Sequence, residues 1–168
     1  MRALMSILIK TQRKEVIFFL SIFSCVLFLI LSQLVSAEAP FTIRGVSTVD
    51  LQDAKILHQA GALFIDVRDK NAWTIGHIIG AVHLDFAAEE FIQLHENKNL
   101  DRKTPIVFYS NNNLTSEAAM ASFFARKWGY EEIYYFRDGY YSWLAGDAAV
   151  EFGIGSEIAT AEAETFTR

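Results

Sequence analysis

The residues most suited to chemistry form a polar loop between two apolar segments. Seven residues follow the apolar run at 106–109 and precede an alanine-rich segment at 117–128: Ser110, Asn111, Asn112, Asn113, Leu114, Thr115 and Ser116. Backbone N–H groups that turn inward before a helix make a cradle for negative charge. The loop is therefore either an anion or carbonyl cradle used for binding, or a turn that only joins a strand to a helix.

Ser110 is the one hydroxyl at the start of this loop, and its use as a nucleophile is disfavoured. A serine oxygen attacks poorly unless an adjacent base takes its proton. The loop contributes three asparagines and no histidine, and no histidine elsewhere is placed by spacing to serve Ser110. A Gly-x-Ser-x-Gly elbow is also missing, so hydrolase chemistry of the serine type is a minor alternative.

The number and position of cysteines exclude disulfides and thiol chemistry in most of the chain. Cys25 is the only cysteine, and it lies inside the apolar run at 16–31. No disulfide can form within the part of the chain that follows this run, although an exported protein would permit one. Any chemistry that needs a cysteine in the following domain is excluded.

The other chemically capable residues are better explained by structure than by catalysis. Asp66 and Arg68 follow an apolar run, where such a pair more often ties loops together through an ion pair. His58, His83 and His95 show no metal-ligand spacing and have no cysteine partners, so we expect no metal and no cofactor. The tyrosines at 130, 134, 135, 140 and 141 are expected to pack in the core rather than to form a recognition surface.

Compact apolar runs alternate with helical periodicity along the chain. Strands are predicted at 62–65, 106–109 and 133–136. Helices are predicted from residue 51 to Gly61 with Ser47 or Thr48 as the cap, around 86–94, and at 117–128 before Gly129. This alternation indicates an α/β fold with a parallel sheet and helices on both faces.

Three stretches between residues 46 and 144 together resemble the rhodanese family. The first holds an Asp-x-Arg motif at a strand end, followed by Gly-His-Ile and Gly-Ala; the second is the seven-residue loop; the third is a strand, a glycine turn and a tryptophan. The positions that carry the motifs outside the loop are Asp66, Arg68, Gly76, His77, Gly139 and Trp143. The resemblance implies the family's α/β fold, with structural roles for these six residues.

The resemblance also implies a chemistry that this loop does not support. In active members a cysteine begins the loop, an arginine follows five residues later, and the thiolate carries sulfur as a persulfide. Here Ser110 stands at the cysteine position and Thr115 at the arginine position. Dual-specificity phosphatases share the loop length and need the same two residues. No catalytic residue is therefore intact, and Glu117 in the first helical turn would repel a bound anion.

The N-terminal part of the chain indicates export. Arg2, Lys10, Arg13 and Lys14 precede the apolar run, against a single acid, so this end is expected on the cytoplasmic side. Small residues at 35–37 favour a signal peptide cleaved after Ala37 over an uncleaved anchor. The predicted parts are a signal peptide or anchor at 1–37, a linker at 38–45, the rhodanese-like domain at 46–145 and an acidic, mobile tail at 146–168, for which a single docked helix is the alternative.

The net charge and the expected location of the domain limit the kinds of ligand that it could bind. Residues 1–37 hold four of the 15 Lys and Arg and one of the 20 Asp and Glu, so the remainder carries 11 against 19, a net charge of −8. Such a domain is not expected to bind nucleic acid, and it would meet a membrane only through an uncleaved N-terminal segment. We expect a periplasmic or extracellular domain that binds an unknown protein partner without catalysis. An uncleaved N-terminal segment would hold it at the inner membrane. The alternative is a sulfurtransferase, or another enzyme, with a non-cysteine nucleophile.

Overall fold

The computed structural model describes residues 21–24 and 38–153, which belong to two separate units, Met1–Ala37 and Glu38–Arg168. Within the first unit, residues 21–24 are helical. No helix among the described residues has the length and apolar character needed to cross a membrane. Most of the apolar run at 16–31, and with it the predicted signal peptide or anchor, lies outside the described residues.

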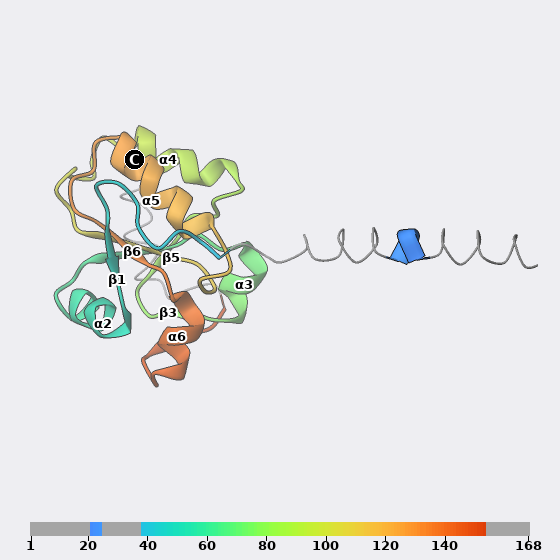
Figure 1. The fold of residues 1–168 in the computed structure, drawn as a ribbon. Coiled ribbons are helices and arrows are strands. Elements are labelled where there is room, and N and C mark those ends of the chain that lie inside the picture. The colour runs from blue at the N-terminus through green and yellow to red at the C-terminus, as the bar shows by residue number, and fades with distance from the viewer. Residues whose placement is uncertain (1–20, 25–37, 154–168) are drawn as a thin grey trace, which may run out of the picture. The chain divides into compact units, whose positions relative to one another are not determined.

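A five-stranded parallel sheet forms the centre of the second unit (Figure 1). Its order is β1 (Ser47–Val49), β6 (Ile133–Phe136), β5 (Ile106–Tyr109), β2 (Leu63–Asp66) and β4 (Val82–His83). The register aligns Asp66 with Tyr109, and Tyr109 with Phe136. Because parallel strands end at the same edge of a sheet, the segments that follow Asp66, Tyr109 and Phe136 are brought together there.

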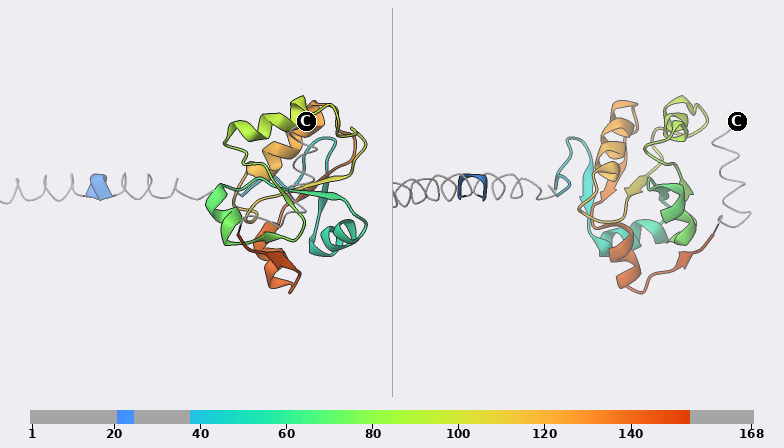
Figure 2. Two further views of the ribbon diagram at one scale, coloured as in Figure 1. Left: turned by 180° about the vertical axis from the view of Figure 1, so that it is seen from behind. Right: turned by 90° about the vertical axis from the view of Figure 1, so that its right-hand side faces the viewer.

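Helices cover both faces of this sheet, which confirms the predicted fold class. One face carries α2 (Leu51–Gln59) and α6 (Gly139–Ala145); the other carries α5 (Glu117–Lys127) and a 3₁₀ helix η2 (Glu89–Ile92) that continues into α4 (Gln93–Glu96) (Figure 2). Strand β5 is buried at every position. Ile106 and Phe108 enter one core and Val107 and Tyr109 the other, as the alternation of side chains along a strand requires.

The start of the domain differs from the sequence-based prediction. Residues 47–49 form the edge strand β1, which pairs with β6, so neither Ser47 nor Thr48 caps the first helix. Asp50 is the cap: its side-chain Oδ1 accepts the Asp53 N–H at 2.9 Å. The predicted cap was wrong because a three-residue strand leaves almost no periodic pattern.

A short antiparallel ribbon extends the fold beyond the predicted end of the domain. It pairs β3 (His77–Ile78), which follows α3 (Lys70–Ile75), with β7 (Val150–Glu151). The Trp143 Nε1–H donates to the Ala149 carbonyl at 2.9 Å, and the Gly153 N–H donates to the Thr74 carbonyl at 2.8 Å. Residues 146–153 are thus ordered parts of the domain rather than the start of a mobile tail, and residues 154–168 lie outside the described residues.

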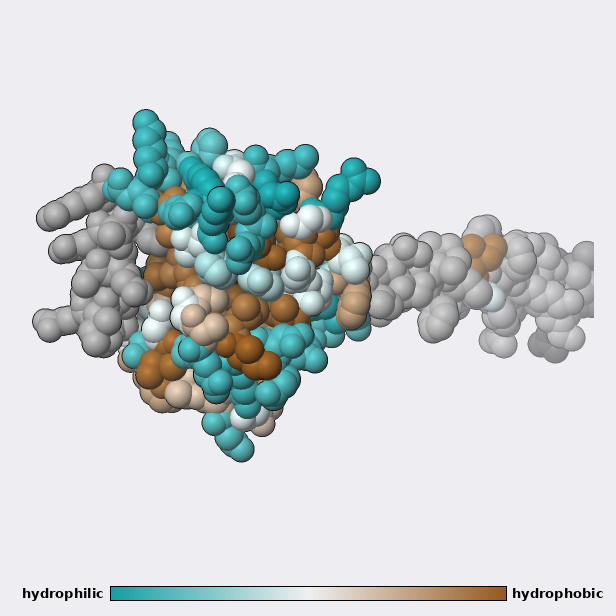
Figure 3. All heavy atoms as spheres, turned by 90° about the vertical axis from the view of Figure 1, so that its left-hand side faces the viewer, coloured by the Kyte–Doolittle hydropathy of each residue, from teal (hydrophilic) through white to brown (hydrophobic). Residues whose placement is uncertain are grey.

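Hydrophobic residues also reach the surface. Figure 3 shows one face on which they gather between zones of hydrophilic residues. Of the five tyrosines predicted for the core, Tyr130, Tyr135 and Tyr140 are buried, whereas Tyr141 is 53% exposed. The exposed apolar residues are scattered over several elements, including α3, α5 and α6, and over the residue after β7.

Candidate functional site

The predicted loop at 110–116 joins the end of β5 to the start of α5, and the first turn of α6 fixes its beginning. The Tyr140 N–H donates to the Ser110 carbonyl at 2.9 Å, and the Tyr141 N–H donates to the Asn111 carbonyl at 3.0 Å. Gly139 makes this approach possible. Its φ is +63°, and a Cβ built on it would lie 2.4 Å from the Ser110 carbonyl oxygen.

Two of the backbone N–H groups that were expected to line a cradle instead donate to acceptors within the loop. The Asn112 side-chain Oδ1 accepts the Leu114 N–H at 2.9 Å. The Asn112 carbonyl accepts the Thr115 N–H at 3.4 Å and lies 3.1 Å from the Thr115 hydroxyl. An Asx turn therefore stabilises the loop from within and leaves it fewer donors for a ligand.

A chain of hydroxyls and a carboxylate occupies the position of the nucleophile. The Thr115 Oγ1 lies 2.9 Å from the Ser110 Oγ, which in turn lies 3.3 Å from the Glu117 Oε2. A carboxylate only accepts, so the Ser110 hydroxyl donates to Glu117. Ser110 is 3% exposed. A carboxylate is a weaker base than the imidazole that activates serine in hydrolases, and its negative charge opposes an anionic ligand.

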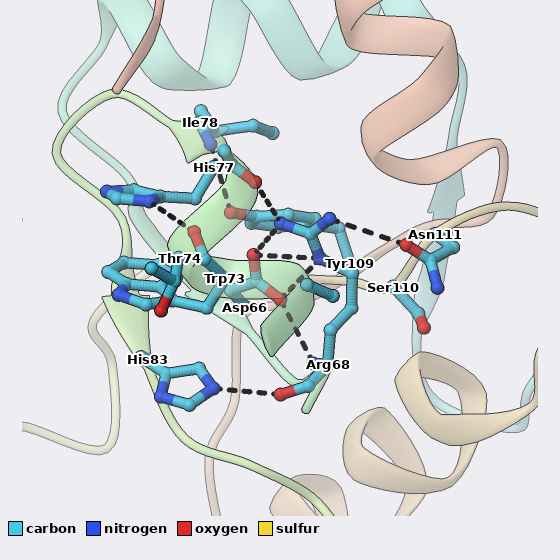
Figure 4. Close-up of polar contacts among 12 residues, drawn as sticks. Asp66, Arg68, Trp73, Thr74, His77, Ile78, His83, Tyr109, Ser110 and Asn111 are labelled. Carbon is cyan, nitrogen blue, oxygen red and sulfur yellow. Dashed lines mark hydrogen bonds and ion pairs between the residues drawn. The ribbon is translucent and has the colours of Figure 1, made fainter. Parts of the chain in front are cut away.

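Asp66 and Arg68 form a buried ion pair beside the loop (Figure 4). The Arg68 Nε lies 2.9 and 3.0 Å from the two Asp66 carboxylate oxygens. The guanidinium also donates to the Gly76 carbonyl at 2.7 Å and stacks 4.2 Å from the centre of the Tyr140 ring. Burial opposes the charged form of Arg68, but the hydrogen-bonded Asp66 carboxylate outweighs this effect, and the pKa of Arg68 is raised.

One contact links this ion pair to the loop. The Arg68 NH1 donates to the Asn111 side-chain oxygen at 3.4 Å, across the carboxyl ends of β2 and β5 (Figure 4). The Nε and Nη2 atoms of the guanidinium are held by the Asp66 carboxylate and the Gly76 carbonyl. Arg68 therefore does not take the place of the arginine that the loop lacks at Thr115.

The histidine of the Gly-His-Ile motif is held in the core away from the loop. The His77 ring is fully buried and stacks on Trp73 with ring centres 3.4 Å apart. Its Nδ1 lies 3.1 Å from the Trp73 carbonyl, and its Nε2 lies 3.4 Å from the Glu151 carboxylate. On the other side of Trp73, the His83 ring lies 5.0 Å away and its Nε2 is 2.8 Å from the Arg68 carbonyl.

These contacts give the predicted motif residues two locations. Asp66, Arg68, Gly76 and Gly139 meet around the start of the loop, whereas His77 and Trp143 stabilise the β3–β7 ribbon. Among residues 21–24 and 38–153, no three His, Cys, Asp or Glu side chains lie close enough to hold a metal ion.

The segment predicted to be a linker contacts the loop directly. The Ala39 N–H donates to the Asn113 carbonyl at 2.8 Å, and Ala39 is buried. Arg137, which follows β6, pairs with the Glu38 carboxylate at 2.7 Å and donates to the Ala39 carbonyl. Residues 38 and 39 are thus docked against the site, although their composition alone suggested a linker.

Sequence reasoning did not assign Tyr140 to the site. Tyr140 supplies the N–H that holds Ser110 and the ring that covers Arg68, and a Cβ at Gly76 would collide with its hydroxyl. Its position directly after Gly139 could have indicated this role. The glycine turn follows β6, so it lies at the same edge of the sheet as the loop.

Comparisons with known proteins agree with the fold. The sequence profile of the rhodanese-like domain matches residues 50–146. The thiosulfate sulfurtransferase GlpE of Pseudomonas entomophila (strain L48) is 34% identical over 93 residues, which cover 55% of this chain and 79% of the relative. The GlpE of Pseudomonas putida (strain GB-1) is 35% identical over 95 residues, which cover 56% and 80%.

Solved structures show the same fold. A polysulfide-sulfur transferase homodimer from Wolinella succinogenes has a TM-score of 0.55 at 23% identity, over 66% of this chain and 81% of that chain. A crystal structure of a protein from Anabaena sp. has a TM-score of 0.55 at 21% identity, over 70% of this chain and 88% of that chain. At these identities the structures establish the fold and nothing further.

Proposed function

Because the chain belongs to the rhodanese-like domain family, we propose that it keeps the family's loop as part of a binding module and does not catalyse sulfur transfer. The observation that carries this proposal is the bond between the Ser110 hydroxyl and the Glu117 carboxylate at 3.3 Å. The hydroxyls of Ser110 and Thr115 stand where the family's chemistry uses a thiolate and a cation, and the Glu117 carboxylate lies beside them.

The chemistry of sulfur transfer explains why the absence of the cysteine and the arginine argues against catalysis. The attacking thiolate forms a bond to the terminal sulfur of the donor, the donor's S–S bond breaks, and the enzyme keeps the sulfur as a persulfide. The Ser110 oxygen has a far higher pKa than a thiol and cannot store sulfur as a persulfide. Glu117 adds repulsion against an anionic donor such as thiosulfate, and the described residues around the loop place no free cation there to offset it.

Sulfur transfer by a non-cysteine group is the second candidate. It is favoured by the relatives at 34% and 35% identity, which are named thiosulfate sulfurtransferases. This candidate requires some group other than a thiol to hold the sulfur, and Ser110 is the only side chain in the family's nucleophile position.

A thiosulfate-to-cyanide assay separates the two candidates. The full chain and its Cys25→Ser variant are incubated with thiosulfate and cyanide, and thiocyanate is measured. We expect both proteins to remain at the level of the uncatalysed reaction. Turnover that persists in the Cys25→Ser variant and is lost in Ser110→Ala would replace the binding proposal with the enzymatic one. The Cys25→Ser variant removes the chain's only thiol, so its turnover reports on the folded domain.

We further propose that this binding takes place outside the cytoplasm. The support is the charge distribution around the apolar run, with four basic residues and one acid before it. Cell fractionation, combined with sequencing of the mature N-terminus, tests the location and the cleavage after Ala37 together. Recovery of the intact chain in the soluble cytoplasmic fraction would contradict the proposal.

A further inference from the structure

The first residues of the second unit are docked against the site loop. We call residues 38–41 the strap; they have no regular secondary structure. The Ala39 N–H donates to the Asn113 carbonyl at 2.8 Å, and Ala39 is only 5% exposed. The Glu38 carboxylate lies 2.7 Å from the Arg137 guanidinium. The strap thus presents a carboxylate, a backbone N–H and a small buried side chain to the domain.

The Arg137 guanidinium contacts both the side chains and the main chain of the strap. It donates to the Ala39 carbonyl from Nε at 3.3 Å and from Nη2 at 3.2 Å, and Nη2 also donates to Glu38. The Phe41 ring centre lies 5.5 Å from its central carbon. Among the described residues, every hydrogen bond and ion pair of the Arg137 side chain goes to the strap. Arg137 therefore serves as a peptide-binding group, with planar donors that suit carboxylate and carbonyl oxygens.

The strap is held to the rest of the domain by few contacts. Its Glu38 side chain is 61% exposed, and Phe41 is 70% exposed. The Phe41 carbonyl accepts the Thr48 hydroxyl at 2.7 Å, which anchors the end of the strap where it joins the domain. An ion pair with one exposed partner stabilises a fold only weakly, and a segment with few buried contacts opens at low cost. The strap can therefore leave while the sheet stays folded.

We propose that Arg137 and the Asn113 carbonyl form a binding site for an acidic peptide segment of a protein partner, and that the strap fills this site in cis. The strap shows the chemistry of the ligand, which is an acidic residue followed by a small one. The carboxylate binds the guanidinium, the next N–H donates to Asn113, and the small side chain takes the place of Ala39. Because the strap must leave before a partner docks, it is an internal competitor. This inference names the ligand of the proposed binding function and rests on that proposal.

The test uses the chain from Glu38 to Arg168, which forms its own compact unit and contains both hydrophobic cores. The probe is the acetylated and amidated peptide AEAPFT, the sequence of residues 37–42. Its binding is followed by NMR titration of the ¹⁵N-labelled domain. In the double change Glu38→Lys and Ala39→Lys, two cations beside Arg137 expel the strap. We expect this released variant to bind the peptide about tenfold more tightly than the parent, whose site is free only while the strap is undocked.

Matched variants locate the site. Adding Arg137→Gln to the released variant should weaken binding about tenfold, because the carboxylate loses its cation. Adding Lys103→Gln instead should leave the affinity unchanged, since this exposed residue precedes β5 and lies at the other edge of the sheet. The peptide AKAPFT should not bind. In the bound state, the amide signal of Asn113 should be among those that shift.

A second variant releases the strap without changing its charge. Ala39 is buried, so Ala39→Trp leaves no room for the strap to dock, and this variant should bind AEAPFT as the double variant does. Circular dichroism checks that each variant is folded.

Three results would overturn the inference. They are folded released variants that bind AEAPFT no more tightly than the parent, equal affinity for AKAPFT, and an affinity that Arg137→Gln leaves unchanged. None of these readouts depends on sulfur transfer. Absence of peptide binding would remove this inference alone, whereas thiocyanate formation by the thiol-free chain would remove the proposed function.

Discussion

At the residue scale, the loop begins with a hydroxyl, that of Ser110, which lies beside the Glu117 carboxylate. Ser110 donates to Glu117, and Asn112 accepts from Leu114 and Thr115, so the hydrogen bonds of the loop close on one another. The guanidinium of Arg68 is already bound to Asp66 and Gly76, and that of Arg137 is paired with Glu38. Under the proposed function, we therefore expect sulfur transfer in this loop to need more than a thiol at position 110.

This reasoning predicts that Glu117 limits any restored activity. The double change Ser110→Cys and Thr115→Arg supplies the thiol and the cation of active members, and we expect some thiocyanate formation if the loop backbone is retained. Adding Glu117→Gln should lower the pKa of the new thiol, because it removes a like charge beside the thiolate. We expect alkylation by iodoacetamide at pH 7 to become roughly tenfold faster in the triple variant. Equal alkylation rates would show that the carboxylate does not act on this position.

A second prediction at this scale concerns Gly139. In Gly139→Ala the new methyl meets the Ser110 carbonyl in addition to the cost of a positive φ, so we expect a loss of about 3 kcal/mol in the free energy of unfolding. Gly61 is the matched control. Its φ is +81° but no atom lies within 4 Å of its added Cβ, so Gly61→Ala should cost only about 1 kcal/mol. Urea midpoints of the two variants measure the difference, and equal midpoints would remove the steric argument.

At the scale of single elements, β6 carries a buried tyrosine hydroxyl, and its raised pKa predicts a loss of stability at high pH. The Tyr135 side chain lies in the core beneath α5, and its hydroxyl has no hydrogen-bond partner among the described residues. Burial raises the pKa of Tyr135 to about 12, from an ordinary value of 10.0. The folded state therefore holds the proton more tightly than the unfolded state does.

The direction of this shift sets a pH window. The contribution of Tyr135 to stability is fully present below pH 10, and it is lost as the pH rises toward 12, because only the unfolded chain releases the proton in that interval. Tyr135→Phe should reduce the alkaline loss of stability. It should also add about 1 kcal/mol at neutral pH, because it removes an unsatisfied buried hydroxyl. Urea unfolding at pH 7, 10 and 11 tests both effects, and a variant with the same alkaline loss as the parent would contradict the assignment.

The elements also show which parts of the fold the sequence can reveal. The runs at 62–65, 106–109 and 133–136 are apolar at nearly every position, so each identified a strand covered on both faces. Strands β3, β4 and β7 have two residues each and β1 has three, which is too short for any periodicity to appear. Their positions depend on pairing with distant segments, which local sequence does not encode.

At the scale of the whole molecule, the local sequence reveals only those parts of the site that do not depend on contacts between distant segments. The loop and its missing cysteine and arginine are local features, and the sequence identified them together with Asp66, Arg68 and Gly139. The bond from Arg68 to Asn111 joins residues 43 positions apart, and the docking of Ala39 on Asn113 joins residues from opposite parts of the domain. Such contacts follow from the strand order, so they became visible only with the fold.

The C-terminal ribbon makes several contacts with segments that are distant in the sequence. Ala148 and Val150 pack against the core that contains Trp143 and Phe136, and the Gly146 carbonyl accepts the Lys55 amine at 2.8 Å. His77 faces Glu151 across the ribbon. Residues 146–151 therefore tie α6, α2 and β3 together, although their composition is that of a polar terminus.

Truncation separates these residues from those that follow. A chain that ends at Ala145 loses β7, the acceptor of the Trp143 indole N–H and the acceptor of the Lys55 amine, so we expect a loss of about 3 kcal/mol in the free energy of unfolding. A chain that ends at Gly153 keeps all of these contacts and should unfold at the urea midpoint of the parent. Both chains begin at Glu38, which keeps the Arg137 ion pair constant. Equal stability of the two chains would show that the ribbon does not stabilise the domain. The boundary predicted at residue 145 would then describe the domain correctly.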